Sequence, residues 1–379
     1  MLFDYETLRL IWWVLLGVLL IGFALTDGFD IGVAILLPFI TKEDVERRVL
    51  INTIGPIWEG NQVWFILGGG AIFAAWPALY AVAFSGFYLA MLLVLLALIL
   101  RPVAFKYRSK LDNPSWRNVW DYLLFISGIV PALIFGVAIG NVLQGVPFHF
   151  NAQLRSFYTG EFLNLLNPFA LIAGLLSVTM LTMHGACFIN LKTTANLKAR
   201  SQQVVQNMAI LSIIIFAGAG VYIYLTELIG YTINSEIPHD GPSNPLYKSV
   251  ELIPMALFRN YKTYPLTTAI PFLSLISLVI TALFKRSAKT ALIFSGISIS
   301  SIITTVGVSL YPFILPSSSH PAQSLVIWDS SSSQTTLFIM LLACIVFLPI
   351  IFAYTSWVYY VFRGKVTTEH ITQNDKTSY

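Results

Sequence analysis

Nine stretches of the sequence are apolar over roughly 20 or more consecutive residues, the length that crosses the ~30 Å hydrocarbon core of a bilayer. An unpaired backbone group costs several kcal/mol in hydrocarbon, so continuous runs of this length fold as helices. The strands of a membrane barrel would instead alternate in polarity over about ten residues. The runs therefore predict an all-α integral membrane protein with about nine transmembrane helices. These helices are expected roughly at residues 10–37, 51–75, 79–100, 122–142, 165–188, 209–229, 266–284, 291–315 and 337–362.

The composition agrees with this class of protein. Of the 379 residues, 56% are apolar and only 11% are charged, which is too few to keep a water-facing surface polar. Residues 1–379 are expected to form a single polytopic membrane domain.

Lysine and arginine collect in alternate connections between the predicted helices, and such connections lie in the cytoplasm. The basic connections are residues 101–117, 192–200 and 285–289, and the tail beyond residue 362 falls on the same side. The N-terminus is then periplasmic and the C-terminus cytoplasmic in a bacterial inner membrane. The net charge of +4 belongs to these connections and to contacts with anionic lipid, so no nucleic-acid partner is indicated.

The sequence lacks the common motifs of soluble enzymes. It has no phosphate-binding glycine loop, no HExxH zinc motif and no GxSxG nucleophile motif. Cys187 and Cys344 fall near or within predicted helices, where they are expected to pack, and no metal site at a usual spacing is present. No catalytic residue is assigned in this chain, and its chemistry has to be sought inside the membrane.

Ionisable residues at membrane depth are costly and indicate function. Asp27 and Asp30 are three residues apart and therefore share one face of the first helix. Glu59 lies about two turns into the second predicted helix, and Arg101 ends the third. All four residues are expected at a similar depth on the cytoplasmic side.

Three interpretations of these four residues remain open. In the structural one, Arg101 pairs with one acid, while Gly28 and Gly32 only allow helices to approach closely. In the second, three carboxylates against one guanidinium leave excess acid, which carries protons from the cytoplasmic side. The third is an ion site of a transporter.

Histidine bears on whether the chain holds haem. Of the five histidines, only His184 lies within a predicted spanning helix, so the chain cannot supply two histidine ligands to one haem in the membrane. His184 is expected to be a core histidine with hydrogen-bond partners rather than a ligand.

A series of short motifs resembles subunit II of the cytochrome bd quinol oxidases, from one end of the chain to the other. The motifs include Tyr5-Glu6-Thr7-Leu8-Arg9, Thr26-Asp27-Gly28-Phe29-Asp30, Trp58-Glu59-Gly60-Asn61-Gln62-Val63-Trp64, Phe73-Ala74-Ala75-Trp76-Pro77, Phe84-Ser85-Gly86-Phe87-Tyr88, Arg101-Pro102, Gly145-Val146-Pro147-Phe148 and Trp328-Asp329-Ser330. The number of these motifs and their order along the whole chain carry the resemblance.

The resemblance implies a fold and a partner. The fold would be two four-helix bundles plus one peripheral helix. The partner would be subunit I, which carries haem b558, haem b595 and haem d and the quinol site, and the complex would oxidise quinol and reduce dioxygen to water. This chain would carry no haem. The resemblance also allows small single-helix accessory subunits, bound lipids and a structural ubiquinone in this subunit.

The resemblance assigns roles to several residues as well. Family members use acids at the positions of Asp27 and Glu59 in a cytoplasmic proton channel, and Trp64 matches a position where oxygen enters from the lipid. The chain departs from the family pattern at Ile57, where relatives have histidine, and at Glu59, where some have aspartate. Glu59 keeps the proton-carrying group, whereas Ile57 removes one candidate relay and leaves the course of the path open. His184 matches no ligand of the family.

The alternative function is a proton- or ion-coupled secondary transporter, which buried acids and an arginine would also suit. Such a protein often has broken helices at matching places in its two halves. Gly68-Gly69-Gly70 in the second predicted helix has no counterpart in the second half, so the oxidase subunit is the preferred hypothesis.

Overall fold

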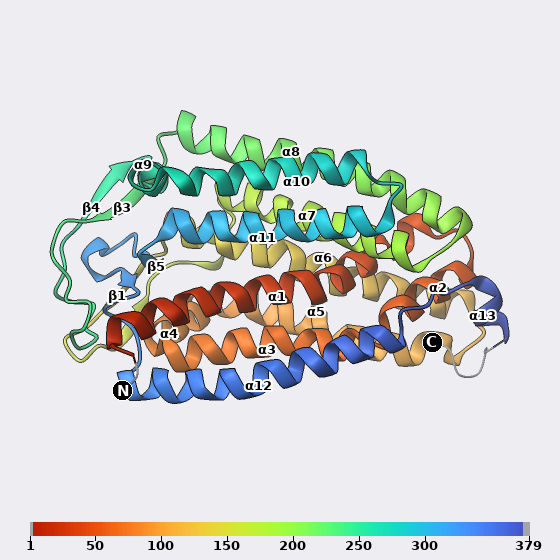
Figure 1. Cartoon of the computed structure of the whole chain (residues 1–379), viewed down its shortest axis with the longest axis horizontal. Helices are drawn as coiled ribbons and strands as arrows, with labels where there is room; N and C mark the ends of the chain where they lie inside the picture. Colours follow the sequence, from red (N-terminus) through yellow and green to blue (C-terminus); the bar gives the residue numbers. More distant parts are fainter. Residues whose placement is uncertain (1–2, 374–379) are drawn as a thin grey trace.

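Long helices that run side by side make up most of the protein (Figure 1). The computed structural model describes residues 3–373. Within this part of the chain, eight helices are long and apolar enough to cross a membrane. They are α1 (Tyr5–Ile40), α5 (Tyr88–Tyr107), α6 (Pro114–Gln144), α7 (Pro168–Lys192), α8 (Ala195–Leu225), α10 (Ala269–Leu283), α11 (Ala288–Leu310) and α12 (Gln334–Val361). The span of α5 continues through a short helical turn to Lys110, and the span of α10 begins with another at Pro265.

A further helix, α3 (Trp58–Ala75), takes the place of the remaining predicted span. It lies against α1 and α12 (Figure 1) but is less apolar than the other spans, because Glu59, Asn61 and Gln62 stand in its first turns. With α3, the structure agrees with the prediction of about nine membrane helices.

Two predicted spans are interrupted in the structure. The run 51–75 was expected as one helix, but a turn that contains Pro56 separates α2 (Asp44–Ile54) from α3. Proline removes a backbone donor and clashes with the preceding turn, which explains the break. The run 79–100 is divided at Phe87 into α4 (Pro77–Gly86) and α5.

Other bounds differ because hydropathy detects the membrane core rather than the helix. Helix α8 begins at Ala195 rather than at residue 209, since its polar first turns continue the helix beyond the apolar segment. The run 291–315 ends as a helix at Leu310, and residues 313–315 form a strand instead.

The helices pack as two four-helix bundles with one peripheral helix, as expected. Helices α1, α3, α5 and α6 form the first bundle, and α7, α8, α10 and α11 form the second. The two bundles meet where α7 packs against α1 and α6, and α12 lies on the outside of α1 and α3 (Figure 1). Helix α1 therefore touches both bundles and the peripheral helix.

Small residues bring α1 and α7 into close contact. A Cβ atom on Gly32 would lie 2.1 Å from the carbonyl oxygen of Leu181, and one on Gly185 would lie 2.6 Å from the Cα of Gly32. Such a pair lets two helix backbones approach, which is how helices gain packing energy in lipid. The expected role of Gly32 in helix packing is thus confirmed, and Gly28 shares it through a close approach to Leu181.

Polar side chains cap the N-termini of several helices. The side chains of Asp4, Asn113, Asn167 and Ser333 accept hydrogen bonds from backbone N–H groups in the first turns of α1, α6, α7 and α12. These caps satisfy donors that a helix leaves unpaired at its start.

Three antiparallel hairpins cover the end of the molecule where α1 begins (Figure 1). They pair β1 (Phe148–Phe150) with β2 (Ser156–Tyr158), β3 (Ile229–Ile233) with β4 (Val250–Pro254), and β5 (Phe313–Leu315) with β6 (Leu325–Val326). The described short helices are η1 (Arg108–Lys110), η2 (Phe162–Leu165), η3 (Ala256–Phe258), α9 (Arg259–Thr263), η4 (Pro265–Thr268), η5 (Pro321–Gln323) and α13 (Thr368–Gln373). Helix α13 packs on α2 at the opposite end, so the two described termini lie at opposite ends of the bundle.

The contact between α1 and α7 gives a matched pair of variants. Replacing Gly32 by Ala inserts a methyl group against backbone, and overpacking of this kind costs about 1–3 kcal/mol. Replacing Gly17 by Ala on the same helix meets no atom within 4 Å. We expect Gly32→Ala to lower the midpoint of thermal unfolding of the purified complex, and Gly17→Ala to leave it unchanged or raise it. Equal midpoints for the two variants would show that the contact does not support the fold.

Candidate functional site

Asp27 and Arg101 form an ion pair inside the first bundle. Nη1 of Arg101, on α5, donates to Oδ1 of Asp27, on α1, over 2.6 Å. The exposed fractions of the two side chains are 0% and 1%. Taking two charges out of water is costly, and only a close partner of opposite sign offsets that cost. The predicted pairing of Arg101 with one acid is therefore present in the structure.

Asp30 lies beside this pair but takes a neutral partner. Nδ2 of Asn61, on α3, donates to Oδ2 of Asp30 over 2.7 Å, and the hydroxyl of Tyr359, on α12, donates to Oδ1 of Asn61 over 2.6 Å. Asp30 and Asn61 are buried. A hydrogen-bonded chain thus runs from the peripheral helix to the acid on α1.

The cluster of Asp27, Asp30 and Arg101 has more polar atoms than partners. Oδ2 of Asp27, Oδ1 of Asp30, and Nε and Nη2 of Arg101 are buried without a hydrogen-bond partner among residues 3–373. An unpaired buried polar atom costs about 1–3 kcal/mol, and more when it is charged. Buried polar groups without a hydrogen-bond partner in the protein are characteristic of sites that exchange protons or hold water.

The fourth predicted residue of this site, Glu59, does not join the other three. Its side chain is exposed on the surface of the chain, whereas Asn61, two residues further along α3, points at Asp30. Residues two positions apart lie on different faces of a helix, which explains why the side chains of Glu59 and Asn61 point in different directions. Glu59 therefore faces whatever covers α3.

Trp64 is buried between three helices. Its ring packs against Gly22 of α1, where a Cβ atom would lie 2.7 Å away, and stacks at a tilt on Phe352 of α12 with 5.2 Å between ring centroids. Only 4% of Trp64 is exposed, so it fills the contact between α3 and its neighbours.

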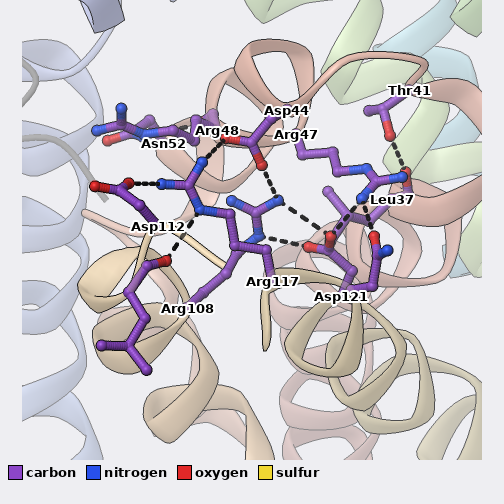
Figure 2. Close-up of polar contacts among 12 residues, drawn as sticks. Leu37, Thr41, Asp44, Arg47, Arg48, Asn52, Arg108, Asp112, Arg117 and Asp121 are labelled. Atoms are coloured by element: carbon purple, nitrogen blue, oxygen red, sulfur yellow. Dashed lines mark hydrogen bonds and ion pairs between the residues drawn. The ribbon is translucent and has the colours of Figure 1, made fainter. Parts of the chain in front are cut away.

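A second charged network lies at the end of the bundle where α1 stops, and Figure 2 shows its side chains converging. Asp121 on α6 accepts from Arg108 over 2.5 Å and from Arg47 over 2.9 Å, and Asp44 on α2 accepts from Arg108 over 2.7 Å and from Arg117 over 2.8 Å. The network joins α2 to η1 and α6. The sequence pattern related Arg108 and Arg117 only to topology, although the acids in residues 43–46 indicate that part of the charge is paired.

Buried charge also holds the opposite end together. Arg9 donates through Nε to the hydroxyl of Ser331 over 2.8 Å and through Nη2 to the carbonyl of Gly241 over 2.9 Å. Lys248 and Asp329 form an ion pair of 2.5 Å between two loops. Burial lowers the pKa of Lys248 and raises the pKa of Asp329, and the attraction between the two groups opposes both shifts.

His184 is a core residue with both ring nitrogens engaged, as expected. Nδ1 lies 2.7 Å from the hydroxyl of Ser295, and Nε2 lies 3.1 Å from the carbonyl oxygen of Leu25. Cys187 is buried and Cys344 is partly buried. Among the described residues, no group of three or more histidine, cysteine or acidic side chains could hold a metal ion.

Sequence reasoning found the acids and the arginine of this site but missed Asn61 and Tyr359. Asn61 could have been found, because an amide in a spanning helix needs a partner. Tyr359 carried no such signal, because its partner lies 298 residues earlier in the chain.

Comparison with protein families gives one match that covers most of the chain. The family described as "Cytochrome bd terminal oxidase subunit II" matches residues 8–362. This range contains every residue of the two charged clusters described above.

Similar curated proteins agree with this family. The chain is 51% identical to a protein of Haemophilus influenzae named "Probable cytochrome oxidase subunit 2", over 99% of this chain and 100% of the relative. It is 47% identical, with the same coverage, to "Cytochrome bd-I ubiquinol oxidase subunit 2" of Escherichia coli. It is 32% identical over 94% of its length to "Cytochrome bd ubiquinol oxidase subunit 2" of Bacillus subtilis, 96% of which is covered.

A solved structure supports the fold independently. A chain of "The structure of bd oxidase from Geobacillus thermodenitrificans" superposes with a TM-score of 0.71 at 17% identity. The match covers 94% of this chain and 98% of the other.

The Asp27–Arg101 pair predicts a coupled effect of mutation. Arg101→Gln leaves a buried carboxylate without its cation, and breaking such a pair costs about 3–5 kcal/mol. The double variant Asp27→Asn/Arg101→Gln removes both charges, so we expect it to unfold at a higher temperature than Arg101→Gln alone. Thermal unfolding of the purified complex measures both. A double variant no more stable than the single one would mean that the pair contributes little to the fold.

Proposed function

Because the chain belongs to the cytochrome bd terminal oxidase subunit II family, we propose that it takes up protons from the cytoplasmic side for dioxygen reduction by a quinol oxidase. Membership makes it an integral membrane subunit of an oxidoreductase complex whose haem cofactors belong to a partner subunit. The proposal adds three features to this assignment. They are the proton-uptake path, the identity of the three haems as b558, b595 and d, and the bound quinone.

Histidine in the described spanning helices does not offer an axial ligand to a haem. His184 is the only histidine in the described spanning helices, and both of its nitrogens have partners. Axial ligation needs a free donor atom. In the proposal the haems belong to subunit I, as the family assignment implies, and supply the reduction of dioxygen there. The role of this chain is then to be sought in its own acids.

The excess of acid over base around Arg101 carries the proposal. Asp27 and Asp30 share one helix face, and the single guanidinium of Arg101 bonds to Asp27 and also attracts Asp30. With both carboxyls ionised the cluster has a net charge of −1, which is costly at membrane depth. One bound proton makes the cluster neutral. The two carboxyl groups can therefore accept and release a proton while the net charge of the cluster stays between −1 and zero.

Asn61 and Tyr359 hold Asp30 in place for this exchange. The amide of Asn61 occupies one oxygen of Asp30 and leaves the other, Oδ1, without a protein partner. The bond from Tyr359 fixes the orientation of the Asn61 amide. We assign Asn61 and Tyr359 as positioning residues of the path.

Glu59 and Trp64 complete the proposal on the face of α3. An exposed carboxylate near the start of a spanning helix suits contact with another subunit better than contact with lipid tails. Glu59 would then pass protons between this chain and subunit I. Trp64, packed between α1, α3 and α12, would border the place where oxygen enters from the lipid.

The transporter alternative has no observation in its favour beyond the buried acids, which the oxidase proposal uses. Small accessory subunits and a structural ubiquinone remain expectations of the family resemblance, without assigned residues. The N-terminus is proposed to be periplasmic and the C-terminus cytoplasmic, from the distribution of lysine and arginine.

Conservative variants of the acids test the proton path. We expect Asp30→Asn to lower quinol oxidase turnover by about 100-fold or more, because positioned proton-transfer groups typically contribute about 100- to 10,000-fold. Glu59→Gln should also lower it. Glu43→Gln, an exposed acid at the same end of the protein, is the control and should keep full turnover.

The haem content of each purified variant complex separates function from assembly. Turnover lost at normal haem content supports the path. Unchanged turnover in both Asp30→Asn and Glu59→Gln, with normal haem, would leave these acids a structural role only.

A further inference from the structure

A long groove opens on the side of the second bundle, and Phe29 and Tyr359 line it where it comes close to the acid cluster. It has a volume of about 1050 Å³ and lies between α1, α7, α10, α11 and α12. Its walls are mostly apolar, and Ile293 in the wall is 60% exposed, so the groove is accessible from the side. A side opening on a spanning helix faces the lipid rather than water.

The groove is as long as one leaflet of a bilayer. Both Lys289, near the start of α11, and Thr304, near its end, line it. At 1.5 Å per residue these positions are about 22 Å apart. Half of a bilayer, including its headgroup region, is also about 20–22 Å thick. An occupant could therefore have its headgroup at Lys289 and its chains reaching the middle of the membrane.

One end of the groove is strongly basic. Lys192 ends α7, Lys289 stands in the first turn of α11, and Arg363 and Lys365 follow α12, so all four cations lie at the same end of the bundle. None of the residues that line the groove within the described chain is acidic. The cations are therefore not neutralised by the walls of the groove.

Lys192 is fixed at this basic end by the protein itself. Its ammonium group donates to the carbonyl of Phe362, at the end of α12, and lies 5.7 Å from the centroid of the Phe188 ring. Only 7% of Lys192 is exposed. An ammonium group has three donors, so this bond leaves donors for an oxygen anion at the mouth of the groove.

From these observations we infer that the groove binds an anionic phospholipid, with its phosphate at Lys192, Lys289, Arg363 and Lys365 and its acyl chains along α11. Basic pockets between spanning helices on the cytoplasmic side are suited to anionic lipid headgroups. A neutral quinone would use the apolar walls but would gain nothing from four cations. Because Tyr359 also lines the groove, the bound lipid packs against the residue that bonds to Asn61.

Native mass spectrometry of the delipidated oxidase complex tests the inference, with phosphatidylglycerol, phosphatidylethanolamine and ubiquinone as separate probes. The wild type should retain phosphatidylglycerol in preference to phosphatidylethanolamine. A cation near an anionic lipid contributes roughly 1 kcal/mol, so Lys289→Gln/Lys365→Gln should weaken retention by about thirtyfold. Both lysines are exposed, so the fold should be unaffected. Lys106→Gln/Lys110→Gln removes two exposed charges at the same end, outside the groove, and should change nothing.

Each outcome is decisive for the groove. Preference for phosphatidylglycerol that is lost only in the groove variant supports the inference. Equal retention of both lipids, equal loss in both double variants, or ubiquinone bound in place of phosphatidylglycerol would overturn it. The measurement reads binding and not turnover, so its failure leaves the proposed proton path untouched.

Discussion

The ion pair between Asp27 and Arg101 is the constraint around which the first bundle is arranged. Neither charge can reach water, so each depends on the other to offset its desolvation. The pair fixes α1 against α5, and Asp30 on the same face of α1 fixes α3 through Asn61 and α12 through Tyr359. Glycines on α1 then allow α7 to pack closely. One helix therefore determines the positions of the two bundles and the peripheral helix.

Most other charged groups lie at the two ends of the bundle, where they hold helices and loops together. The arginines and aspartates of α2, η1 and α6 pair with one another at one end (Figure 2), and Arg9 and Lys248 bind loop groups at the other. Most of this charge is satisfied. The acid cluster on α1 and the basic end of the groove differ, since one has excess acid and the other has excess base. These two places are where we locate proton exchange and lipid binding.

The sequence was sufficient for the class of fold and for most of the spans, because lipid requires long apolar helices whatever their packing. It also indicated that Asp27, Asp30 and Arg101 would meet, since isolated charges in a membrane need partners. Its limits have physical causes. Hydropathy cannot place the helix break at Pro56. Residues at the same depth in the membrane can also point to different sides of their helices, so Glu59 was grouped with Asp27 and Asp30 although its side chain points away from them. Tyr359 and Asn61 meet only after the whole chain has folded.

The family assignment makes this chain a subunit of a quinol oxidase complex with haem in a partner subunit. The most direct test is a reduced-minus-oxidised visible spectrum of the complex that copurifies with the chain from native membranes, with its protein bands identified. The account predicts a haem d band and a larger haem-bearing partner, with no haem in this chain. A haem-free preparation without a partner, stable in mild detergent, would contradict it.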